Sequence, residues 1–216
     1  METVNRLPHI LVGAGGHAKV LLDCLRRQGT DVLGFLDADP ALRGTAYCGL
    51  PVLGSDAELD RYVPGSVLLV NALGSTRPAA NRRAIYDGLK ASGHMFATVV
   101  HPAAAVGAGV VLGEGAQVMA GVVIQPDASI GANAILNTGA IVDHDCVIGA
   151  HVHVAPGCVL SGGVRVGDGS HLGTGAVVIQ GIKIGAGCLV AAGAVVVRDV
   201  PDGAEVMGVP AMARRL

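Results

Sequence analysis

The feature that most constrains this chain is a six-residue repeat that runs without a break from Val106 to Val200. Every sixth position holds a Val, Ile or Leu, and the residue four places later is small or aliphatic and never charged. A fixed hexapeptide period is typical of a solenoid of the parallel β-helix type. The sixteen apolar anchors are Val106, Leu112, Val118, Ile124, Ile130, Leu136, Val142, Ile148, Val154, Leu160, Val166, Leu172, Val178, Ile184, Val190 and Val196.

Each hexad is expected to form one side of a triangular coil. Three hexads close a coil of about eighteen residues, so the repeat predicts about five coils whose anchors stack inside. The anchor is often followed by Gly, which we expect to accept the unusual φ of tight corners. The alternative is a set of ordinary strands in a sandwich, but sandwich turns fall at variable spacings of about 8–12 residues. An unbroken register favours the β-helix.

The composition agrees with this prediction. The chain has 216 residues, with three Tyr, two Phe and no Trp, so Val, Ile and Leu must fill its interior. A net charge of −2 without a basic run argues against a nucleic-acid partner. The apolar stretches are short and rich in Gly, which argues against membrane insertion.

The five cysteines form no CxxC pair, and their number is odd. Cys146, Cys158 and Cys188 stand at the small inward position of their hexads, where Cys acts as a small hydrophobic residue. The first residues also lack the apolar region of a secretory signal peptide. We therefore expect a reduced, cytoplasmic protein.

The first hundred residues alternate strand and helix patterns, which predicts a small parallel sheet like half of a doubly wound, Rossmann-like α/β fold. We place an α/β domain at 1–102 and a β-helix domain with a terminal cap at 103–216. The predicted elements are strands at 9–15, 32–36, 66–73 and 95–100, a helix that stops at Gly29, a short helix through Tyr62 opened by a capping box of Ser55 and Glu58, and a helix from Pro78 to Lys90 that buries Ile85 and Leu89.

The first candidate site is the glycine loop between the first strand and the first helix, with Gly13, Gly15, Gly16 and His17. Its backbone N–H groups and the helix N-terminus would face a phosphate, and the spacing to Asp37 suits an acid that binds a ribose. The alternatives are a tight turn without a ligand and a nicotinamide dinucleotide site. The dinucleotide is disfavoured because the unit is small and the hexads are no oxidoreductase domain.

The second candidate site is the segment from Asn137 to Asp145. His144 and Asp145 follow the anchor Val142 at outward-facing positions, where the coil itself needs no His. A His beside an acid is a candidate general base with an oriented imidazole. The alternative interpretation is a solvated surface His.

Three further histidines stand on the hexads. His151 and His153 suggest a metal site, but two ligands seldom suffice and no Cys or acid pattern completes the set, so we expect no metal. His171 follows His153 by one predicted coil and is expected to stack beside it.

These residues resemble the bacterial sugar O- and N-acyltransferases of the left-handed β-helix class. The closest group acetylates the 4-amino group of nucleotide-linked 4-amino-4,6-dideoxysugars, such as GDP-perosamine or a UDP-bacillosamine precursor. The resemblance covers nearly the whole chain and rests on GAGGHA, FLD, the hexads, NTGAIVDHD and the terminal GVPA. It implies an N-terminal nucleotide-sugar domain, a left-handed β-helix and a homotrimer that holds acetyl-CoA between neighbouring helices.

The resemblance also implies roles for single residues. His144 looks like the catalytic base, and Asp145 stands where the family often has Glu. Met212 stands where a basic residue commonly follows GVPA, with Arg214 and Arg215 close behind. The implied acetyl-CoA contacts are His153, Gly162, Thr174 and Ala192; the implied substrate contacts are Asn137 together with Gly13, Gly15, Gly16, His17 and Asp37.

The sequence therefore predicts an acetyl-CoA-dependent N-acetyltransferase that acts on a UDP- or GDP-linked amino sugar. An alternative within the enzymes is O-acetylation of a sugar such as sialic acid. A second alternative is a non-catalytic nucleotide-sugar-binding scaffold trimer, against which the presence of His144 argues. A dinucleotide-dependent enzyme would need a catalytic domain that the hexads do not supply.

Overall fold

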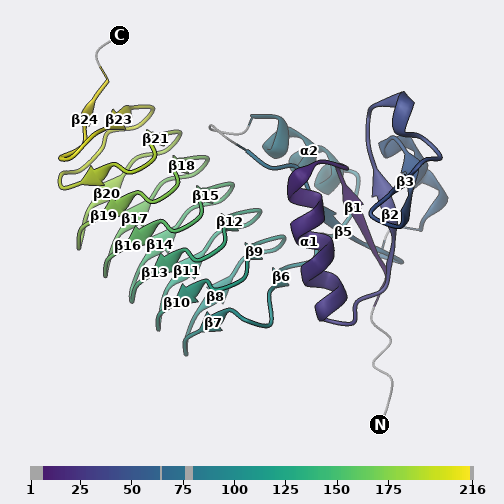
Figure 1. Ribbon diagram of the computed structural model, residues 1–216, viewed down its shortest axis with the longest axis horizontal. Helices are drawn as coiled ribbons and strands as arrows, with labels where there is room; N and C mark the ends of the chain where they lie inside the picture. Colours follow the sequence, from purple (N-terminus) through teal and green to yellow (C-terminus); the bar gives the residue numbers. More distant parts are fainter. Residues whose placement is uncertain (1–6, 64, 76–79, 215–216) are drawn as a thin grey trace.

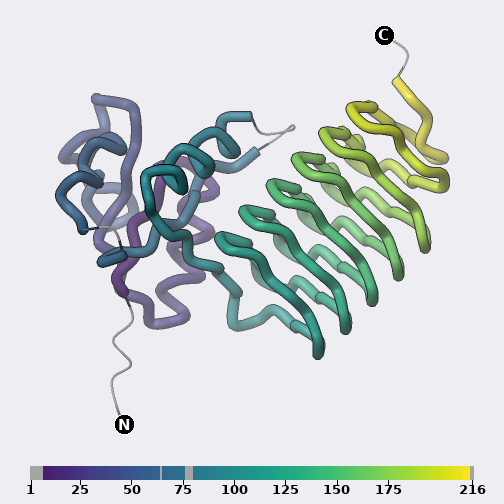
Figure 2. The backbone as a smooth tube through the Cα atoms, turned by 180° about the vertical axis from the view of Figure 1, so that it is seen from behind, coloured from purple at the N-terminus to yellow at the C-terminus, as the bar shows by residue number. Residues whose placement is uncertain are grey.

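The computed structural model describes residues 7–63, 65–75 and 80–214. An α/β unit and a stack of triangular coils lie side by side, and the last coil is far from the α/β unit (Figures 1 and 2). No helix among the described residues has both the length and the apolar character needed to span a bilayer.

The α/β unit has a five-stranded sheet in the order β3-β4-β2-β1-β5. The neighbours from β4 to β5 pair in parallel, as the alternation of strands and helices predicts. Helix α1 buries Leu21, Leu22 and Leu25, and helix α2 buries Arg82, Tyr86 and Leu89. The elements are β1 (His9–Val12), α1 (Gly16–Arg27), β2 (Val32–Leu36), β3 (Ala46–Tyr47), β4 (Leu50–Gly54), β5 (Leu68–Asn71) and α2 (Ala80–Ala91).

Four details of this unit differ from the prediction. The Ser55 side chain caps nothing, and residues Asp56–Arg61 form a 3₁₀ turn, so the capping box is wrong. The antiparallel β3–β4 hairpin was not predicted. The strand expected at 95–100 is divided: Phe96 bridges to Leu69 of the α/β sheet, and β6 (Val99–Val100) pairs with the coils. Ile85 is only half-buried, and the predicted helix start at Pro78 lies outside the described residues.

The coils confirm the predicted register. Each two-residue strand pairs in parallel with the strand one coil away, as Ile141 does with Val159 and His153 with His171. The first face holds β7 (Ala105–Val106), β10 (Val123–Ile124), β13 (Ile141–Val142), β16 (Val159–Leu160), β19 (Val177–Val178) and β22 (Val195–Val196). The second face holds β8 (Val111–Leu112), β11 (Ser129–Ile130), β14 (Val147–Ile148), β17 (Arg165–Val166) and β20 (Lys183–Ile184). The third face holds β6, β9 (Gln117–Val118), β12 (Ile135–Leu136), β15 (His153–Val154), β18 (His171–Leu172), β21 (Leu189–Val190), β23 (Glu205–Met207) and β24 (Met212–Ala213).

The anchors from Val118 to Val196 are buried, and only the first two, Val106 and Leu112, are not. Strand β24 folds back antiparallel on β23 at the far end, in the position expected for a cap. The proposed domain boundary at 102/103 remains a prediction.

The glycines after the anchors have a different role from the one predicted. Gly113 has an ordinary φ, but a Cβ there would lie 2.6 Å from the backbone nitrogen of Ala132 in the same stack. The left-handed φ occurs two residues later, as at Gly157, and this place also accepts Asp145 and His151, both with φ of 60°. The post-anchor glycines are therefore required by close stacking of coils rather than by unusual φ.

Candidate active site

The glycine loop leaves the N-terminus of α1 open. Gly15 is the N-cap and supplies no side chain to the first turn; the Ala18 N–H donates to the Gly15 carbonyl at 3.1 Å, and the N–H groups before it are available to a ligand. A Cβ built on Gly15 or Gly16 meets no atom within 4 Å. The loop can therefore approach an anionic group closely.

Asp37 supports this loop from the end of β2. Its Oδ2 accepts a hydrogen bond from the Ala14 backbone N–H at 2.9 Å, and its Oδ1 accepts one from Asp39 N–H at 3.0 Å. A small cavity of about 120 Å³ opens beside it. The cavity is lined by Val12, Gly13, Leu36, Asp37, Ala38, Asp56, Leu73 and Ile85.

A longer groove runs from α1 along the corner between the third and first faces. Two adjoining hollows of about 400 and 470 Å³ share Ser75, Asn137 and His153. The one near α1 also contains Gly16 and His17, and the other contains Thr174 and Ala192. Six residues singled out from the sequence are thus brought together: Gly16, His17, Asn137, His153, Thr174 and Ala192.

His17 connects α1 to the first complete coil. Its Nε2 lies 2.8 Å from Oε1 of Gln117, whose Nε2 donates to the Asn71 carbonyl at 2.8 Å. The amide oxygen of Gln117 must therefore accept, and His17 Nε2 carries a hydrogen. Burial lowers the pKa of His17 to about 4, so the ring is neutral at physiological pH.

His153 lies on the floor of the groove and is neutral for the same reason. Burial, with additional effects from neighbouring His171 and His17, lowers the pKa of His153 to about 3. The rings of His153 and His171 lie edge to face with centroids 4.8 Å apart, which confirms the predicted stacking. A ring with this pKa cannot act as a general base near pH 7.

His144 has the opposite character. Its Nδ1 lies 2.7 Å from Oδ2 of Asp145, and both side chains are more than half exposed. The hydrogen bond to Asp145 raises the pKa of His144. Its Nε2 projects over Gly162, where an added Cβ would lie 2.6 Å from Nε2 and Cε1. The carboxylate thus holds one ring nitrogen and leaves the other free, as a base requires.

His144 and His153 do not meet within one chain. His144 follows β13 at the corner between the first and second faces. His153 lies on the third face, which is opposite that corner in a triangular coil, and Asn137, Thr174 and Ala192 stand at the corner between the third and first faces. The structure therefore separates the predicted base from Asn137, His153, Thr174 and Ala192, whereas Gly162, the other predicted cofactor contact, lies beside His144.

Comparisons with known proteins identify families for both parts of the chain. A model of the PglD N-terminal domain matches residues 10–89, and models of the bacterial transferase hexapeptide and of the hexapeptide repeat of succinyl-transferase together match 109–198. A search of curated proteins gives no match.

Solved structures extend the match to almost the whole chain. A His→Asn mutant of perosamine N-acetyltransferase from Caulobacter crescentus, in complex with CoA and GDP-perosamine, is 42% identical over 96% of this chain and 97% of its own, with a TM-score of 0.89. The acetyltransferase domain of PglB from Neisseria gonorrhoeae, in complex with acetyl coenzyme A, is 36% identical over 97% and 100%, with a TM-score of 0.90. WeeI from Acinetobacter baumannii is 29% identical over 97% and 100%, with a TM-score of 0.87. The chain belongs to the left-handed β-helix sugar N-acetyltransferases.

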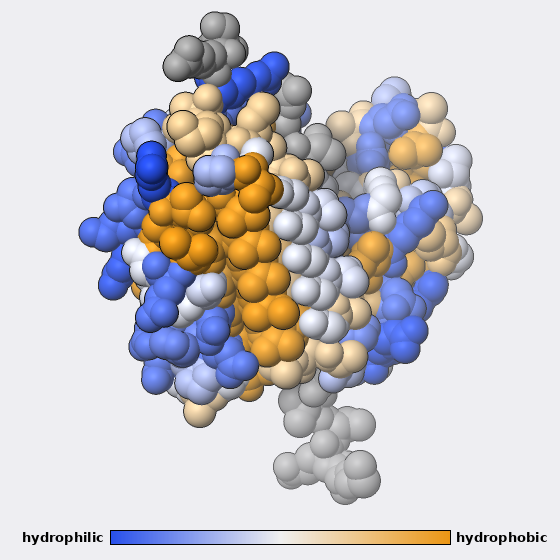
Figure 3. Space-filling model, turned by 60° about the vertical axis from the view of Figure 1, so that its left-hand side comes forward, coloured by the Kyte–Doolittle hydropathy of each residue, from blue (hydrophilic) through white to orange (hydrophobic). Residues whose placement is uncertain are grey.

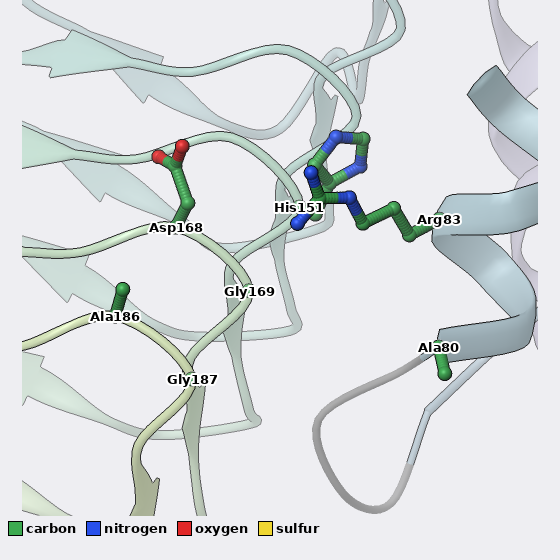
Figure 4. Close-up of a pocket in the computed structure, with 7 residues that line it drawn as sticks. All are labelled: Ala80, Arg83, His151, Asp168, Gly169, Ala186 and Gly187. Atoms are coloured by element: carbon green, nitrogen blue, oxygen red, sulfur yellow. The ribbon is translucent and has the colours of Figure 1, made fainter. Parts of the chain in front are cut away.

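This N-acetyltransferase family member also has a pocket on the other edge of the third face. Ala80 and Arg83 of α2 face His151, Asp168 and the glycine-containing turns below them (Figure 4). His151 Nε2 lies 3.7 Å from Asp87 Oδ1, and its Nδ1 lies 3.0 Å from Asn133 Nδ2. Within residues 7–63, 65–75 and 80–214 no group of three or more His, Cys, Asp or Glu could hold a metal ion.

Sequence reasoning did not single out three polar residues in and behind the groove. Ser75 contacts His153, Gln117 contacts His17, and Arg82 is buried behind both. Gln117 was detectable in principle, because it stands among apolar residues just before an anchor. Arg82 was not detectable, because its sequence pattern is the same as that of an exposed Arg on a helix. Of the tail residues, Arg214 pairs with Glu205 at 3.2 Å, and Arg215 lies outside the described residues.

Proposed function

We propose that this protein transfers the acetyl group of acetyl-CoA to the 4-amino group of a nucleotide-linked 4-amino-4,6-dideoxysugar. The observation that carries the proposal is the 42% identity, over nearly the full chain, to an enzyme crystallised with CoA and GDP-perosamine. The groove provides the matching local features: an open helix N-terminus at one end and small corner residues along the coils at the other.

The nucleotide end of the substrate is assigned to the glycine loop. The free N–H groups at Gly15 and Gly16 and the positive end of α1 suit a diphosphate. The cavity beside Gly13 and Asp37 offers carboxylate acceptors for a ribose or a base. The sugar then extends along His17 toward Asn137.

The acyl donor is assigned to the corner residues Thr174 and Ala192 and to Gly162. Gly162 has no side chain, so its backbone can approach the thioester closely. A backbone N–H aimed at the developing oxyanion is worth about 10²–10³ in rate.

The chemistry follows from the two kinds of His. The neutral amine attacks the thioester carbonyl, the N–C bond forms, the C–S bond breaks and the thiolate leaves. His144 Nε2 takes the proton from the nitrogen and delivers it to the thiolate or to solvent, while Asp145 holds Nδ1. General-base help of this kind contributes about 10²–10⁴ in rate. His153, whose pKa is about 3, serves as a neutral contact instead.

The separation of His144 from the groove leads us to infer a homotrimer. The first face lies between the His144 corner and the Asn137 corner, and its outward row is entirely apolar: Ala105, Val123, Ile141, Val159, Val177 and Val195. Figure 3 shows a continuous hydrophobic stripe along the coils, in keeping with this row. Three such faces turned toward one axis bury the stripe and bring His144 of one subunit to the groove of the next.

The proposal is tested by incubating the protein with acetyl-CoA and a GDP- or UDP-linked 4-amino-4,6-dideoxyhexose and following free thiol. The matched control is the same sugar nucleotide with a 4-hydroxyl group. Thiol release with the amine alone supports N-acetylation. Release only with the hydroxyl compound would favour O-acetylation, and tight binding of sugar nucleotides without turnover would favour a scaffold.

A further inference from the structure

Arg82 is a buried cation without an acidic partner among the described residues. It stands on α2 with 3% of its surface exposed. Nη1 donates to the carbonyls of Asn71 and Leu73 at 2.6 and 2.7 Å, and Nη2 to that of Asn133 at 3.3 Å. Burying an Arg that is paired only with neutral groups is expensive. A residue buried at this cost is expected to hold the segments to which it donates hydrogen bonds in place.

What Arg82 holds is the end of β5 together with the segment that follows it. Two of its three acceptors lie there, and the third lies on a corner of the coils. Asn71 reinforces the same joint, because its Nδ2 donates to the Arg82 carbonyl at 3.0 Å and to Asn133 Oδ1 at 3.2 Å. The guanidinium therefore fixes this segment of the α/β unit against the β-helix. Ser75, two residues beyond Leu73, is positioned by that joint.

Ser75 determines which nitrogen of His153 carries the proton. The Ser75 carbonyl lies 3.0 Å from His153 Nδ1, and its hydroxyl lies 2.9 Å from the same nitrogen. The hydroxyl can donate or accept, but a carbonyl can only accept, so a protonated Nδ1 is the form that satisfies both contacts. At the other side of the ring, Asn137 Nδ2 lies 3.2 Å from Nε2. The Asn137 amide is oriented by Thr138 N–H, which donates to its Oδ1 at 2.8 Å, so Nδ2 faces the ring as a donor and Nε2 accepts.

We propose that Arg82 is a positioning residue that acts through the Ser75 carbonyl to fix His153 as the Nδ1–H tautomer, which makes Nε2 a permanent hydrogen-bond acceptor in the groove. A ligand N–H group, either an amide of the acyl donor or the sugar amine, can then bind Nε2 by replacing or sharing the Asn137 contact. The charged and titratable groups that face His153 are His171, His17 and Arg82, and none of them is acidic. The Ser75 carbonyl is the one neighbour that favours the protonated ring, and burial together with these three groups outweighs it.

The inference uses the proposed function only for the identity of the ligand, and its test needs no turnover. Protein labelled with ¹⁵N at His is studied by long-range proton–nitrogen NMR near pH 7, and the His153 signals are assigned from their loss in His153→Gln. We expect Nδ1–H over Nε2–H by about tenfold or more, the preference given by a buried carbonyl that must be satisfied. An Nε2–H ring in the wild-type protein would overturn the proposal, even if the enzyme is fully active.

Variants then test the part played by Arg82. Arg82→Met should give a mixed tautomer population, and Arg82→Lys, which can still donate to the carbonyls, should restore most of the Nδ1–H form. The control is Arg83→Met, because Arg83 is exposed on the same helix and pairs only with Asp87. Folding is checked by melting temperature. A folded Arg82→Met with an unchanged tautomer would refute the role of Arg82, and should that variant not fold, the wild-type spectrum decides.

Activity gives an independent readout. Arg82→Met should raise KM for whichever substrate contacts Nε2 while KM for the other stays within about twofold, since it changes one hydrogen bond, and Arg82→Lys should stay near the wild-type values. Equal effects on both KM values would indicate a general loss of structure and contradict the positioning role. If Nδ1–H is confirmed but no acetyl transfer is found, the proposed function fails and the tautomer assignment stands.

Discussion

Replacing Gly162 with Ala offers a way to move His144 without changing it. The added Cβ would be placed 2.6 Å from Nε2 and Cε1 of His144. Gly162 does not have a left-handed φ, so its backbone accepts Ala without strain. The His144 side chain is exposed and can give way. The substitution therefore displaces the free nitrogen of the proposed base and leaves the coil intact.

The size of the displacement follows from the same distances. Ordinary van der Waals contact begins at 3.4 Å, so the ring must retreat by about 0.8 Å. A misplacement of about 1 Å at a reacting group can cost about 10²-fold in rate. We therefore expect kcat to fall by between about 10- and 100-fold, no further than on removal of the imidazole. Stability should stay level or rise by up to about 1 kcal/mol, because Gly→Ala at a compatible φ restricts the unfolded chain.

The assay is a double-mutant cycle. We would measure kcat and KM for wild type, Gly162→Ala, His144→Asn and the double variant at saturating amino-sugar nucleotide, with melting temperatures alongside. If the added methyl acts by moving His144, it should change kcat little once the imidazole is gone. The double variant should then resemble His144→Asn.

Two results would refute this reasoning. Equal kcat losses from Gly162→Ala in both backgrounds would mean that the methyl acts on something other than His144. A large rise in KM for acetyl-CoA with kcat unchanged would place the acyl donor, rather than the base, against Gly162.

The same geometry supports four further predictions. His144→Asn should lower kcat by about 10²-fold or more, and retention of more than about a third of kcat would mark His144 as a binding residue instead. Because Asp145 raises the pKa of His144, wild-type activity should rise with pH through a pKa above the ordinary value for His, and Asp145→Asn should move that rise to lower pH. Gly15→Val should weaken sugar-nucleotide binding in calorimetry, because the new side chain occupies the space in front of the loop. Acetyl-CoA binding should be unchanged, since a Cβ at Gly15 meets no protein atom and the fold can accept it. Equal loss of binding of both ligands would point to damage of the fold. Ile141→Glu, in the middle of the apolar row, should dissociate the trimer, as measured by light scattering, whereas Lys183→Glu on the second face should not. A wild-type monomer with full activity would contradict the proposed trimer. Gly113→Ala should cost about 3 kcal/mol in denaturant unfolding through overpacking, against about 1 kcal/mol for Gly157→Ala, whose φ is left-handed but whose surroundings are open. The reverse order would show that close stacking does not require Gly after the anchor.

The β-helix could be predicted because every hexad carries the same information. Leu160 and Val178 repeat the same inward contact one coil apart, so a sixteen-fold pattern fixes register and pairing before any tertiary contact is known. The stacking of His171 on His153 followed from that register alone. The role of the glycines could not be predicted in this way. The six-residue period shows where Gly stands, but it does not show whether an unusual φ or a lack of space requires it.

The α/β unit was less predictable because its pattern is short and is altered by the junction with the coils. Val99 and Val100 look like the end of a fourth strand, yet they pair with β9 because the first coil offers an open edge. Ser55 and Glu58 fit a capping box in sequence, but Glu58 forms ion pairs with Arg43 and Arg61 instead. Long-range partners decide such segments, and spacing along the chain does not show them.

The candidate site divides in the same way. Residues on hexads, such as Asn137 and Thr174, could be placed relative to one another because the coil is regular. Arg82 could not, since its hydrogen-bond acceptors come from two separate segments, residues 71–73 and Asn133, that meet its helix only in the folded chain. A buried arginine on an amphipathic helix has the same sequence pattern as an exposed one such as Arg83.

Asp145 shows how backbone and chemistry constrain one position together. It stands at the hexad place with left-handed φ, at 60°, where Gly is most common in this chain and where Asp and Asn are tolerated better than longer side chains. From that backbone its short side chain reaches Nδ1 of the adjacent His144 at 2.7 Å. The resemblance drawn from the sequence implies that Glu is common here, so the Asp is a departure from that expectation. It is not a departure in contact, because a carboxylate still orients the ring and still leaves Nε2 facing Gly162. The left-handed backbone thus favours a short residue such as Asp at this place whatever its neighbour is. The adjacent His144 ring favours a carboxylate there.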